Sequence, residues 1–283
     1  MNNTTSIILF LASIAYVYWV TIRLNDYNDK IEAHNNLYKK NEMTFAIVIT
    51  ETRKNDALIK RSIENKRKYA ATHKYHFYVW DKEVTINDDP EWGTLKNGWL
   101  KPYAAIQAMK VYPEVDWIWW VDTDVVIMNF MISLDLILET VIPEKHIVVA
   151  NKCDGVNSGS LFVRNTVQGR VYMERMIDVF LISQKTWNKR LYEQISFWAF
   201  EKFDGNRFRQ DVQYVADRSI NARPPGFGKC KGDDDTVRFH PDDFLVHVAG
   251  NGGSKARKEN ISKWEIVEQY LNTADAHYKY SYK

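Results

Sequence analysis

The pattern of apolar and polar positions predicts alternating strands and helices from residue 44 onward. Short apolar runs bounded by turn residues indicate buried strands, and apolar residues at three- and four-residue spacing indicate amphipathic helices. Strands are expected at 45–50, 75–80, 117–122, 146–150 and 244–250, and another follows a tight turn that begins at Asn157. Helices are expected at 56–73, 103–111, 133–141, 167–183, 192–203 and 263–271. The opening strand, helix and strand form a βαβ unit, which predicts an α/β fold with a mostly parallel sheet.

A second apolar pattern lies near the amino terminus. Residues 6–22 contain no charged side chain, and Tyr16, Tyr18 and Trp19 gather at the carboxyl end like an interfacial aromatic belt. A helix of this length spans ~25 Å, slightly less than a typical bilayer core. A signal peptide is the alternative, but residues 1–5 lack a basic side chain and the run ends in large aromatics. We expect a short tail at 1–5, an uncleaved transmembrane anchor at 6–22, a polar stem at 23–43 and a globular domain at 44–283.

The orientation of this anchor is open. Basic residues follow the span, from Arg23 to Lys40, and none precedes it. Read literally, the positive-inside rule keeps the carboxyl side in the cytoplasm. Acidic residues such as Asp26 and Asp29 dilute this bias.

The apolar run at 117–121 ends in Asp122 and Asp124, after which apolar residues resume. A buried strand has no use for unpaired carboxylates, because burying a lone charge is costly. A divalent metal is the simplest positive partner, and Mn²⁺ or Mg²⁺ prefers hard oxygen ligands. Such an ion holds a diphosphate on its open side, which suits an enzyme whose leaving group is a nucleotide diphosphate. A second D-x-D, at Asp233 and Asp235, lies in a polar, Gly-flanked stretch and is interpreted as a solvated loop.

Composition narrows the function classes only slightly. The net charge is +2 with basic and acidic residues interleaved, so nothing predicts nucleic-acid binding. Aromatic residues make up 14% of the chain, which fits carbohydrate handling and fits an aromatic core equally well. Two cysteines, Cys153 and Cys230, are too few for a disulfide framework, and either a pair or two free thiols remains open.

Several segments in order resemble one enzyme family. They are Trp99–Pro102, Tyr112–Glu114, Trp117–Asn129, Asn157–Asn165, Glu193–Gln194 and Phe244–Asn251. Together they resemble glycosyltransferase family 34, which includes fungal galactosyl- and mannosyltransferases and plant xyloglucan xylosyltransferases, over residues 44–272. The resemblance implies a GT-A fold, a type II anchor in the Golgi membrane with a lumenal catalytic domain (the ER being the alternative), and a retaining, Mn²⁺-dependent reaction.

The resemblance also implies roles for five residues. Asp122 and Asp124 match the metal ligands, and His247 matches the third ligand, although an isolated histidine in an apolar strand is more often a core residue. An imidazole ligand suits Mn²⁺ better than Mg²⁺, which remains the alternative. Glu193 matches a residue that binds sugar hydroxyls. Gln194 matches one that lies below the anomeric carbon and steadies developing positive charge.

The remaining substrate contacts are less regular. Asn157 matches a donor-site asparagine, with an Asx turn as the structural alternative. Family members often carry a basic residue soon after the glycine of the His loop. Here Gly250 is followed by Lys255, so either this lysine or backbone N–H groups of the glycine turn are expected to contact phosphate. Lys101 is a further candidate cation.

The resemblance implies transfer of a hexose, galactose or mannose, from UDP-galactose or GDP-mannose to a glycan or glycoprotein with α linkage. Front-face attack is favoured, because glutamine is a poor nucleophile. A sequon at Asn260 is available to glycosylation in a lumenal domain. One alternative is a non-catalytic, membrane-anchored subunit of a glycosyltransferase complex, and homo- and hetero-oligomers both remain open. The other is a haloacid-dehalogenase-type phosphatase, with Asp122 as nucleophile and Asp124 as acid/base. That fold places its motif on the first strand, whereas a βαβ unit precedes it here.

Overall fold

The computed structural model describes residues 43–53, 56–86, 94–95, 97–152, 155–186, 192–225, 236–250 and 261–281. The chain divides into two compact units, Met1–Met43 and Thr44–Lys283, and the account below concerns the second. Among the described residues, no helix combines the length and apolar character needed to cross a membrane. Several predictions fall outside the described residues: the tail, the anchor and the stem apart from Met43, both cysteines, the D-x-D at Asp233, Lys255 and Asn260.

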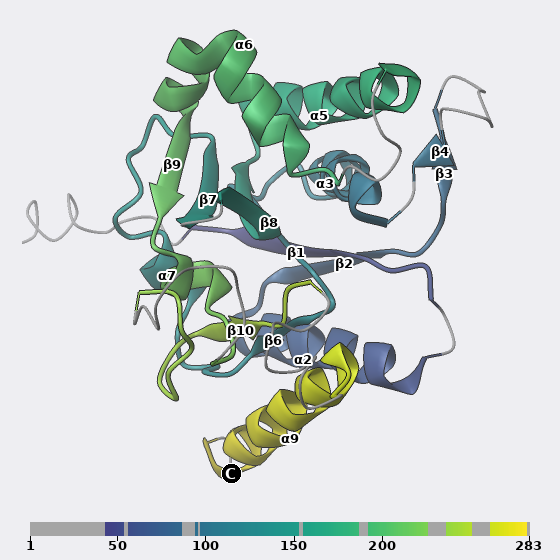
Figure 1. Ribbon diagram of the computed structural model, residues 1–283. Helices are drawn as coiled ribbons and strands as arrows, with labels where there is room; N and C mark the ends of the chain where they lie inside the picture. The colour runs from purple at the N-terminus through teal and green to yellow at the C-terminus, as the bar shows by residue number, and fades with distance from the viewer. Residues whose placement is uncertain are drawn as a thin grey trace, which may run out of the picture. The chain divides into compact units, whose positions relative to one another are not determined.

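A mixed six-stranded sheet forms the centre of this unit (Figure 1). Its strands, in spatial order, are β2 (His76–Trp80), β1 (Phe45–Thr50), β5 (Trp117–Val121), β8 (Gly155–Arg164), β7 (Ile147–Lys152) and β9 (Val212–Val215). β1 is parallel to β2 and β5, and β7 is parallel to β9. Only β8 runs antiparallel to its neighbours, β5 and β7. Because most neighbouring pairs are parallel, the predicted α/β fold with a mostly parallel sheet is confirmed.

Three helices cover one face of the sheet, the upper one in Figure 1. They are α3 (Leu100–Val111), α5 (Val167–Thr186) and α6 (Ile195–Asp211). Alternate strand residues such as Ile118 and Trp120 point into this layer and pack with Tyr172, Met173 and Phe197. This aromatic core anchors β5 below α3, and it thereby fixes the strand that leads to the two aspartates.

The opposite face carries α2, α9 and a small two-stranded sheet (Figure 1). These elements are α2 (Ala57–His73), α9 (Lys263–Ser281), β6 (Val125–Ile127) and β10 (Leu245–His247), with the short helix α7 (Asp217–Asn221) beside β10. Asp56 caps α2 by accepting hydrogen bonds from the N–H groups of Leu58 and Ile59. α2 ends at Lys74, whose φ of 59° is left-handed.

The peripheral elements complete the fold. They are the hairpin of β3 (Val84–Thr85) and β4 (Thr94–Leu95), the 3₁₀ turn η1 (Asn97–Trp99) and the single turn α4 (Leu134–Ile137). α4 is shorter than the helix predicted at 133–141. α9 extends ten residues past the predicted 271, and α6 begins later and ends later than predicted, with a kink at Asp204.

One prediction about the sheet is wrong. Asn157 was expected to open a tight turn, but it lies inside β8, which already begins at Gly155. Within this segment Ser160 pairs with Val121 of β5 and Asn157 pairs with Ala150 of β7, while residues 158–160 have no register partner in β7. A register shift at Val149/Ala150 interrupts the ladder with β7. Such a bulge re-aims the backbone next to a site.

Candidate metal and donor site

The two aspartates lie in the turn between β5 and β6, at the carboxyl end of the central strand. Val125 N–H donates to the Asp122 carbonyl at 3.2 Å, and this closes the turn. The Asp122 N–H bonds to the Gly159 carbonyl of β8 at 2.8 Å, and Val248 N–H bonds to the Asp124 carbonyl at 3.0 Å. The backbone therefore turns at the D-x-D, and both carboxylates reach one point, as a shared metal requires.

His247 completes a three-residue cluster at this point. One ligand atom each from Asp122, Asp124 and His247 lie within 4.8 Å of one another. The Nδ1–H of His247 donates to Oδ1 of Asn221 at 2.5 Å, so Nε2 carries the lone pair. Nε2 is buried, has no hydrogen-bond partner within the described chain, and lies 3.3 Å from Asp124 Oδ1. Two carboxylates and one oriented imidazole nitrogen fit a divalent cation such as Mn²⁺.

The orientation of His247 depends on its surroundings. Asn221, at the end of α7, donates its own amide to Asp217 Oδ1 at 2.8 Å, which fixes its oxygen toward the imidazole. On the other side the ring lies against Gly159. A Cβ at Gly159 would lie 2.0 Å from His247 Cε1, so any side chain there would displace the ring.

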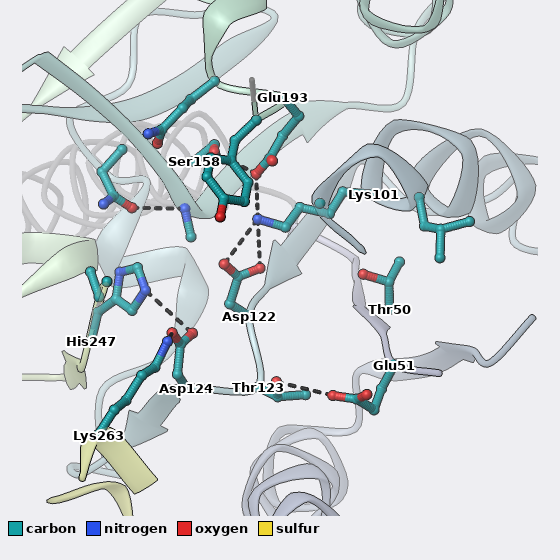
Figure 2. Close-up of a pocket in the computed structure, with 18 of the residues that line it drawn as sticks. Thr50, Glu51, Lys101, Asp122, Thr123, Asp124, Ser158, Glu193, His247 and Lys263 are labelled. Atoms are coloured by element: carbon teal, nitrogen blue, oxygen red, sulfur yellow. Dashed lines mark hydrogen bonds and ion pairs between the residues drawn. The ribbon is translucent and has the colours of Figure 1, made fainter. Parts of the chain in front are cut away.

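Lys101 connects the metal cluster to the predicted catalytic pair (Figure 2). Its Nζ lies 2.7 Å from Asp122 Oδ1 and 2.5 Å from Glu193 Oε1, and Ser158 Oγ donates to the same Glu193 oxygen at 2.8 Å. Burial raises the pKa of Asp122 to about 6, against the opposing charge of Lys101. Burial alone would lower the pKa of Lys101, but Asp122 and Glu193 outweigh it and raise this pKa above its ordinary value.

Glu193 and Gln194 occupy the turn before α6, not the interior of the helix predicted at 192–203. The Ser196 N–H bonds to the Glu193 carbonyl at 3.0 Å as the helix begins. Glu193 is only 3% exposed, because Lys101 draws its carboxylate inward. Its other oxygen lies against Gly98, where a Cβ would come within 1.9 Å. Gln194 lines the cavity beside it.

The cavity above these residues has a volume of about 700 Å³, within the usual range of small-molecule sites. Residues 50–53, which comprise the last residue of β1 and the three that follow it, also line this cavity. There Arg53 holds Glu51 through Nε at 2.8 Å and Nη2 at 2.6 Å, and it lies over the ring of Trp264 with 5.0 Å to the centroid. Thr123, between the two aspartates, donates to Glu51 at 3.3 Å (Figure 2). Most of the lining residues are polar or charged, and Leu100 and Trp264 are among the apolar ones.

The remaining predicted substrate contacts have mixed outcomes. Asn157 lines the cavity, but its Oδ1 accepts from Gly159 N–H at 2.8 Å, so this oxygen serves an Asx turn. Gly250 also lines the cavity, with a left-handed φ of 73° that favours glycine. Lys255 lies outside the described residues.

Sequence reasoning missed two lysines near the aspartates. Lys263, the first residue of α9, forms an ion pair with Asp124. Lys66 of α2 is fully buried and donates to the Ser62 hydroxyl at 2.6 Å and to the carbonyls of Thr123 and Val125. Both lie in charged helical sequence, where a lysine normally faces solvent. Only their tertiary neighbours distinguish them.

The pKa values of Asp124 and Lys66 both lie below their ordinary values, but for different reasons. Burial would raise the pKa of Asp124, but His247 and Lys263 outweigh it and hold this pKa well below its usual range. Burial lowers the pKa of Lys66 to about 7, and the nearby carboxylates of Asp124 and Asp122 offset that shift only in part.

Comparison with solved structures supports the fold. The chain superposes on a glycosyltransferase involved in the glycosylation of the major capsid of PBCV-1 with a TM-score of 0.59, at 18% identity. The match covers 80% of this chain and 99% of that one. The layered α/β fold and the similarity to a solved glycosyltransferase structure both agree with the predicted GT-A architecture.

Sequence comparison identifies relatives in two yeasts. An uncharacterized alpha-1,2-galactosyltransferase of Schizosaccharomyces pombe is 30% identical over 75% of this chain and 69% of its own length. Another alpha-1,2-galactosyltransferase of the same yeast is 27% identical over 72% of this chain. The "Probable alpha-1,6-mannosyltransferase MNN10" of Saccharomyces cerevisiae is 28% identical over 67% of this chain. The chain spans 59% and 54% of the lengths of the latter two relatives.

The family model for the galactosyl transferase GMA12/MNN10 family matches residues 40–144, which include the D-x-D turn. The S. pombe relative extends the similarity over most of the chain. The protein therefore belongs to glycosyltransferase family 34, the galactosyl transferase GMA12/MNN10 family.

Proposed function

We propose that this protein is a metal-dependent, retaining glycosyltransferase that moves galactose or mannose from a nucleotide-diphosphate sugar to a glycan or glycoprotein with α linkage. The observation that carries the proposal is the cluster of Asp122, Asp124 and His247 in the lining of the cavity, where Nε2 of His247 has no hydrogen-bond partner in the described chain and lies 3.3 Å from Asp124 Oδ1. Glu193 and Gln194 line the same cavity.

The metal ligands in this proposal are Asp122, Asp124 and His247, and the donor set favours Mn²⁺, with Mg²⁺ as the alternative. A divalent cation bound there supplies positive charge that offsets the negative charge of the departing diphosphate.

The protein groups around the cavity orient the sugar. Lys101 bridges Asp122 and Glu193, so the metal side and the sugar side of the site are held at a fixed separation. Glu193 is assigned to the sugar hydroxyls, and Gln194 to the region below the anomeric carbon. In the reaction the bond from the anomeric carbon to phosphate oxygen breaks, and the acceptor oxygen bonds to that carbon on the same face. The acceptor proton passes to the departing phosphate oxygen, so no covalent intermediate on Gln194 is required.

The choice of donor rests on the relatives, whose names specify galactose and mannose. UDP-galactose and GDP-mannose are therefore the candidate donors. A single-pass type II anchor in the Golgi membrane, formed by residues 6–22, with a lumenal catalytic domain belongs to the same proposal. Family membership argues against the phosphatase alternative, and the Lys101 ion pair leaves Asp122 poorly placed as a nucleophile.

Donor turnover by the purified full-length chain tests this proposal. With Mn²⁺ present, hydrolysis and transfer are measured for UDP-galactose, UDP-glucose, UDP-xylose and GDP-mannose, and again after chelation. We expect one of these sugar donors to release its nucleotide, and chelation to abolish this release. In Asp124→Asn the rate of release should fall at least about 100-fold, because the loss of a charged metal ligand weakens the stabilisation of the departing diphosphate. Lys68→Met, which changes a lysine of α2 outside the cavity, is the matched control. A folded chain that binds Mn²⁺ but releases nucleotide from none of these donors would favour a non-catalytic subunit.

A further inference from the structure

Lys263 is not a candidate metal ligand, but it contacts one of the three candidate ligands, Asp124. Its ammonium forms an ion pair with Asp124 Oδ2, while His247 approaches the other oxygen of the same carboxylate at 3.3 Å (Figure 2). The side chains of Lys263 and Asp124 are 23% and 11% exposed, so the pair is partly shielded from water. Lys263 therefore places a positive charge beside the carboxylate that the proposed metal would use.

The backbone of Lys263 is firmly placed. Ser262 Oγ accepts from Glu265 N–H at 3.1 Å, and the Glu265 carboxylate accepts from Ser262 N–H at 3.0 Å. This reciprocal pair is a capping box, which fixes the start of α9. The four-carbon stem of Lys263 remains flexible, so its ammonium can move while its Cα stays at the edge of the cavity.

Three cations line the described part of the cavity, and their partners differ. Arg53 is committed to Glu51 through two side-chain hydrogen bonds. Lys101 is committed to both Asp122 and Glu193. Among the described residues, Lys263 forms an ion pair with Asp124 alone, the residue that a metal ion would claim, and its ammonium also lies 5.6 Å from the centroid of the Trp264 ring. Of these three cations, Lys263 is therefore the one that would keep no described carboxylate partner if a metal bound Asp124.

An ammonium released from Asp124 stays close to the open side of the cluster. A divalent cation and the Lys263 ammonium on the same Asp124 carboxylate would repel each other strongly. The displaced group is still tethered at the cavity edge, where anionic groups bound to the cation must lie. A diphosphate there is the natural new partner, because charge-assisted hydrogen bonds to phosphate are strong.

We propose that Lys263 is an exchangeable cation, which neutralises Asp124 before metal binds and contacts the diphosphate of the donor afterwards. The inference rests on the proposed function, because it requires a divalent cation at Asp122, Asp124 and His247. It assigns to the first turn of α9 the phosphate contact that the sequence suggested for Lys255. It also gives Lys263 opposite effects on two successive binding steps.

Binding measurements on the full-length chain separate these effects. In Lys263→Met we expect Mn²⁺ alone to bind about five-fold more tightly, because the ion no longer displaces a partly buried ammonium. With Mn²⁺ saturating, the variant should bind UDP or GDP, whichever the wild type prefers, about ten-fold more weakly. Titration calorimetry measures both constants without catalysis. Unchanged or weaker Mn²⁺ binding, or unchanged nucleotide binding, would overturn the inference.

Two control variants make the comparison specific. Lys263→Arg keeps the positive charge at the same position, so both constants should stay within about three-fold of the wild type. Lys68→Met removes one positive charge from a lysine that pairs with Asp275 of α9, far from the cavity lining, and both constants should be unchanged. If Lys68→Met reproduced the effects of Lys263→Met, loss of general charge or of α9 packing would explain them, and the inference would fail.

A measurement on the unaltered chain gives an independent readout. Acetylation of Lys263 by a small amine-reactive ester, followed by peptide mass spectrometry, reports how free its ammonium is. We expect slow acetylation without metal, faster acetylation with Mn²⁺, and slow acetylation again when UDP or GDP is added. A rate that does not rise with Mn²⁺ would contradict the exchange.

The two levels of the proposal fail in different ways. If the wild type does not bind Mn²⁺ or Mg²⁺, or binds it equally in Asp124→Asn, the metal site of the proposed function is wrong. If the wild type binds metal through Asp124 but Lys263→Met leaves both constants unchanged, only the role of Lys263 is wrong.

Discussion

Two residues position the His247 imidazole. Asn221 forms a hydrogen bond with the ring, and Gly159 has no side chain that would collide with it. The amide oxygen of Asn221 selects the tautomer that leaves Nε2 as an acceptor. The bare Cα of Gly159 leaves room for the ring beside β8. Neither residue is a candidate ligand, yet both determine whether the third ligand reaches the two aspartates.

Gly159→Ala, which adds only a Cβ, tests whether the space beside Gly159 positions the His247 ring. The added Cβ would lie 2.0 Å from His247 Cε1, so the imidazole must move away from Asp124. We expect Mn²⁺ affinity to fall at least about ten-fold, in the range seen when groups that orient metal ligands are changed. Titration calorimetry measures it. Gly205→Ala, where the nearest atom is the mobile end of Arg209 at 3.2 Å, is the control and should bind Mn²⁺ like the wild type.

Lys66 predicts a pH dependence of stability. Its pKa is lowered from 10.5 to about 7 by burial, so above pH 7 the unfolded chain binds more protons than the folded chain. The free energy of unfolding should therefore rise with pH between about 7 and 10.5. Below pH 7 Lys66 is protonated in both states, so it adds no pH dependence there. Relative to Lys66→Met, the metal-free wild type should gain about 2 kcal/mol of unfolding free energy from pH 7 to 9. Parallel pH profiles in denaturant titrations would contradict a buried, titrating Lys66.

At the scale of elements, α2 supports the metal turn by hydrogen bonds rather than by apolar packing alone. Asn65 contacts Ile127 on both backbone groups, with its amide donating to the carbonyl at 3.0 Å and its oxygen accepting from N–H at 2.9 Å. Tyr69 and His73 continue the row one turn at a time, bonding the carbonyls of Ile132 and Phe130 at 2.7 Å each. Asn65 thus pairs the edge of β6 that β10 leaves open.

Asn65→Ala tests how much the two hydrogen bonds between Asn65 and Ile127 contribute to stability. Asn65 is 4% exposed, so truncation leaves both backbone groups of Ile127 buried and unpaired. We expect the free energy of unfolding to fall by about 2 kcal/mol, the usual penalty for such orphaned groups. Chemical denaturation measures it, with the exposed Asn206→Ala as a control that should differ little from wild type. A loss as small as that of the control would show that water replaces Asn65.

The elements differ in how far the sequence predicts them. β1, β2 and β5 are short apolar runs and α2 and α5 have apolar residues at helical spacing, and the predicted positions of all five agree closely with the structure. β6 and β9 were missed: Val125–Ile127 simply continues the apolar run of β5, and β9 follows α6 without a turn signal. Strand pairing, which defines these short segments, depends on residues distant in sequence.

The sequence predicts those site residues whose role follows from their neighbours along the chain. It does not predict those whose role depends on contacts formed by the fold. Asp122 and Asp124 stand out because two carboxylates follow a buried strand. The burial of Glu193 was not foreseeable, because it depends on Lys101 from another helix. Lys66 was hidden for the same reason, since its carbonyl partners at Thr123 and Val125 carry no signal in sequence.

At the scale of the whole molecule, metal binding should stabilise the fold. The three candidate ligands come from the β5–β6 turn and from β10, so a bound ion links segments that unfolding separates. At a free Mn²⁺ concentration of about 100 times Kd, we expect the folded state to gain about 2.7 kcal/mol. Thermal unfolding with and without chelator measures the shift. The same shift in Asp124→Asn would mean that Mn²⁺ acts elsewhere on the chain.

The pairing of β6 with β10 has a consequence for how the protein is made. β6 leaves the ribosome long before β10, so a nascent chain presents the two aspartates beside a strand edge that has no β10 partner. Such an edge invites pairing with other chains. A premature stop before Leu245 would leave that edge permanently open, in a product without His247 and Lys263. Nonsense and frameshift alleles that end the reading frame between β6 and β10 should therefore yield aggregation-prone polypeptides rather than weakened enzymes.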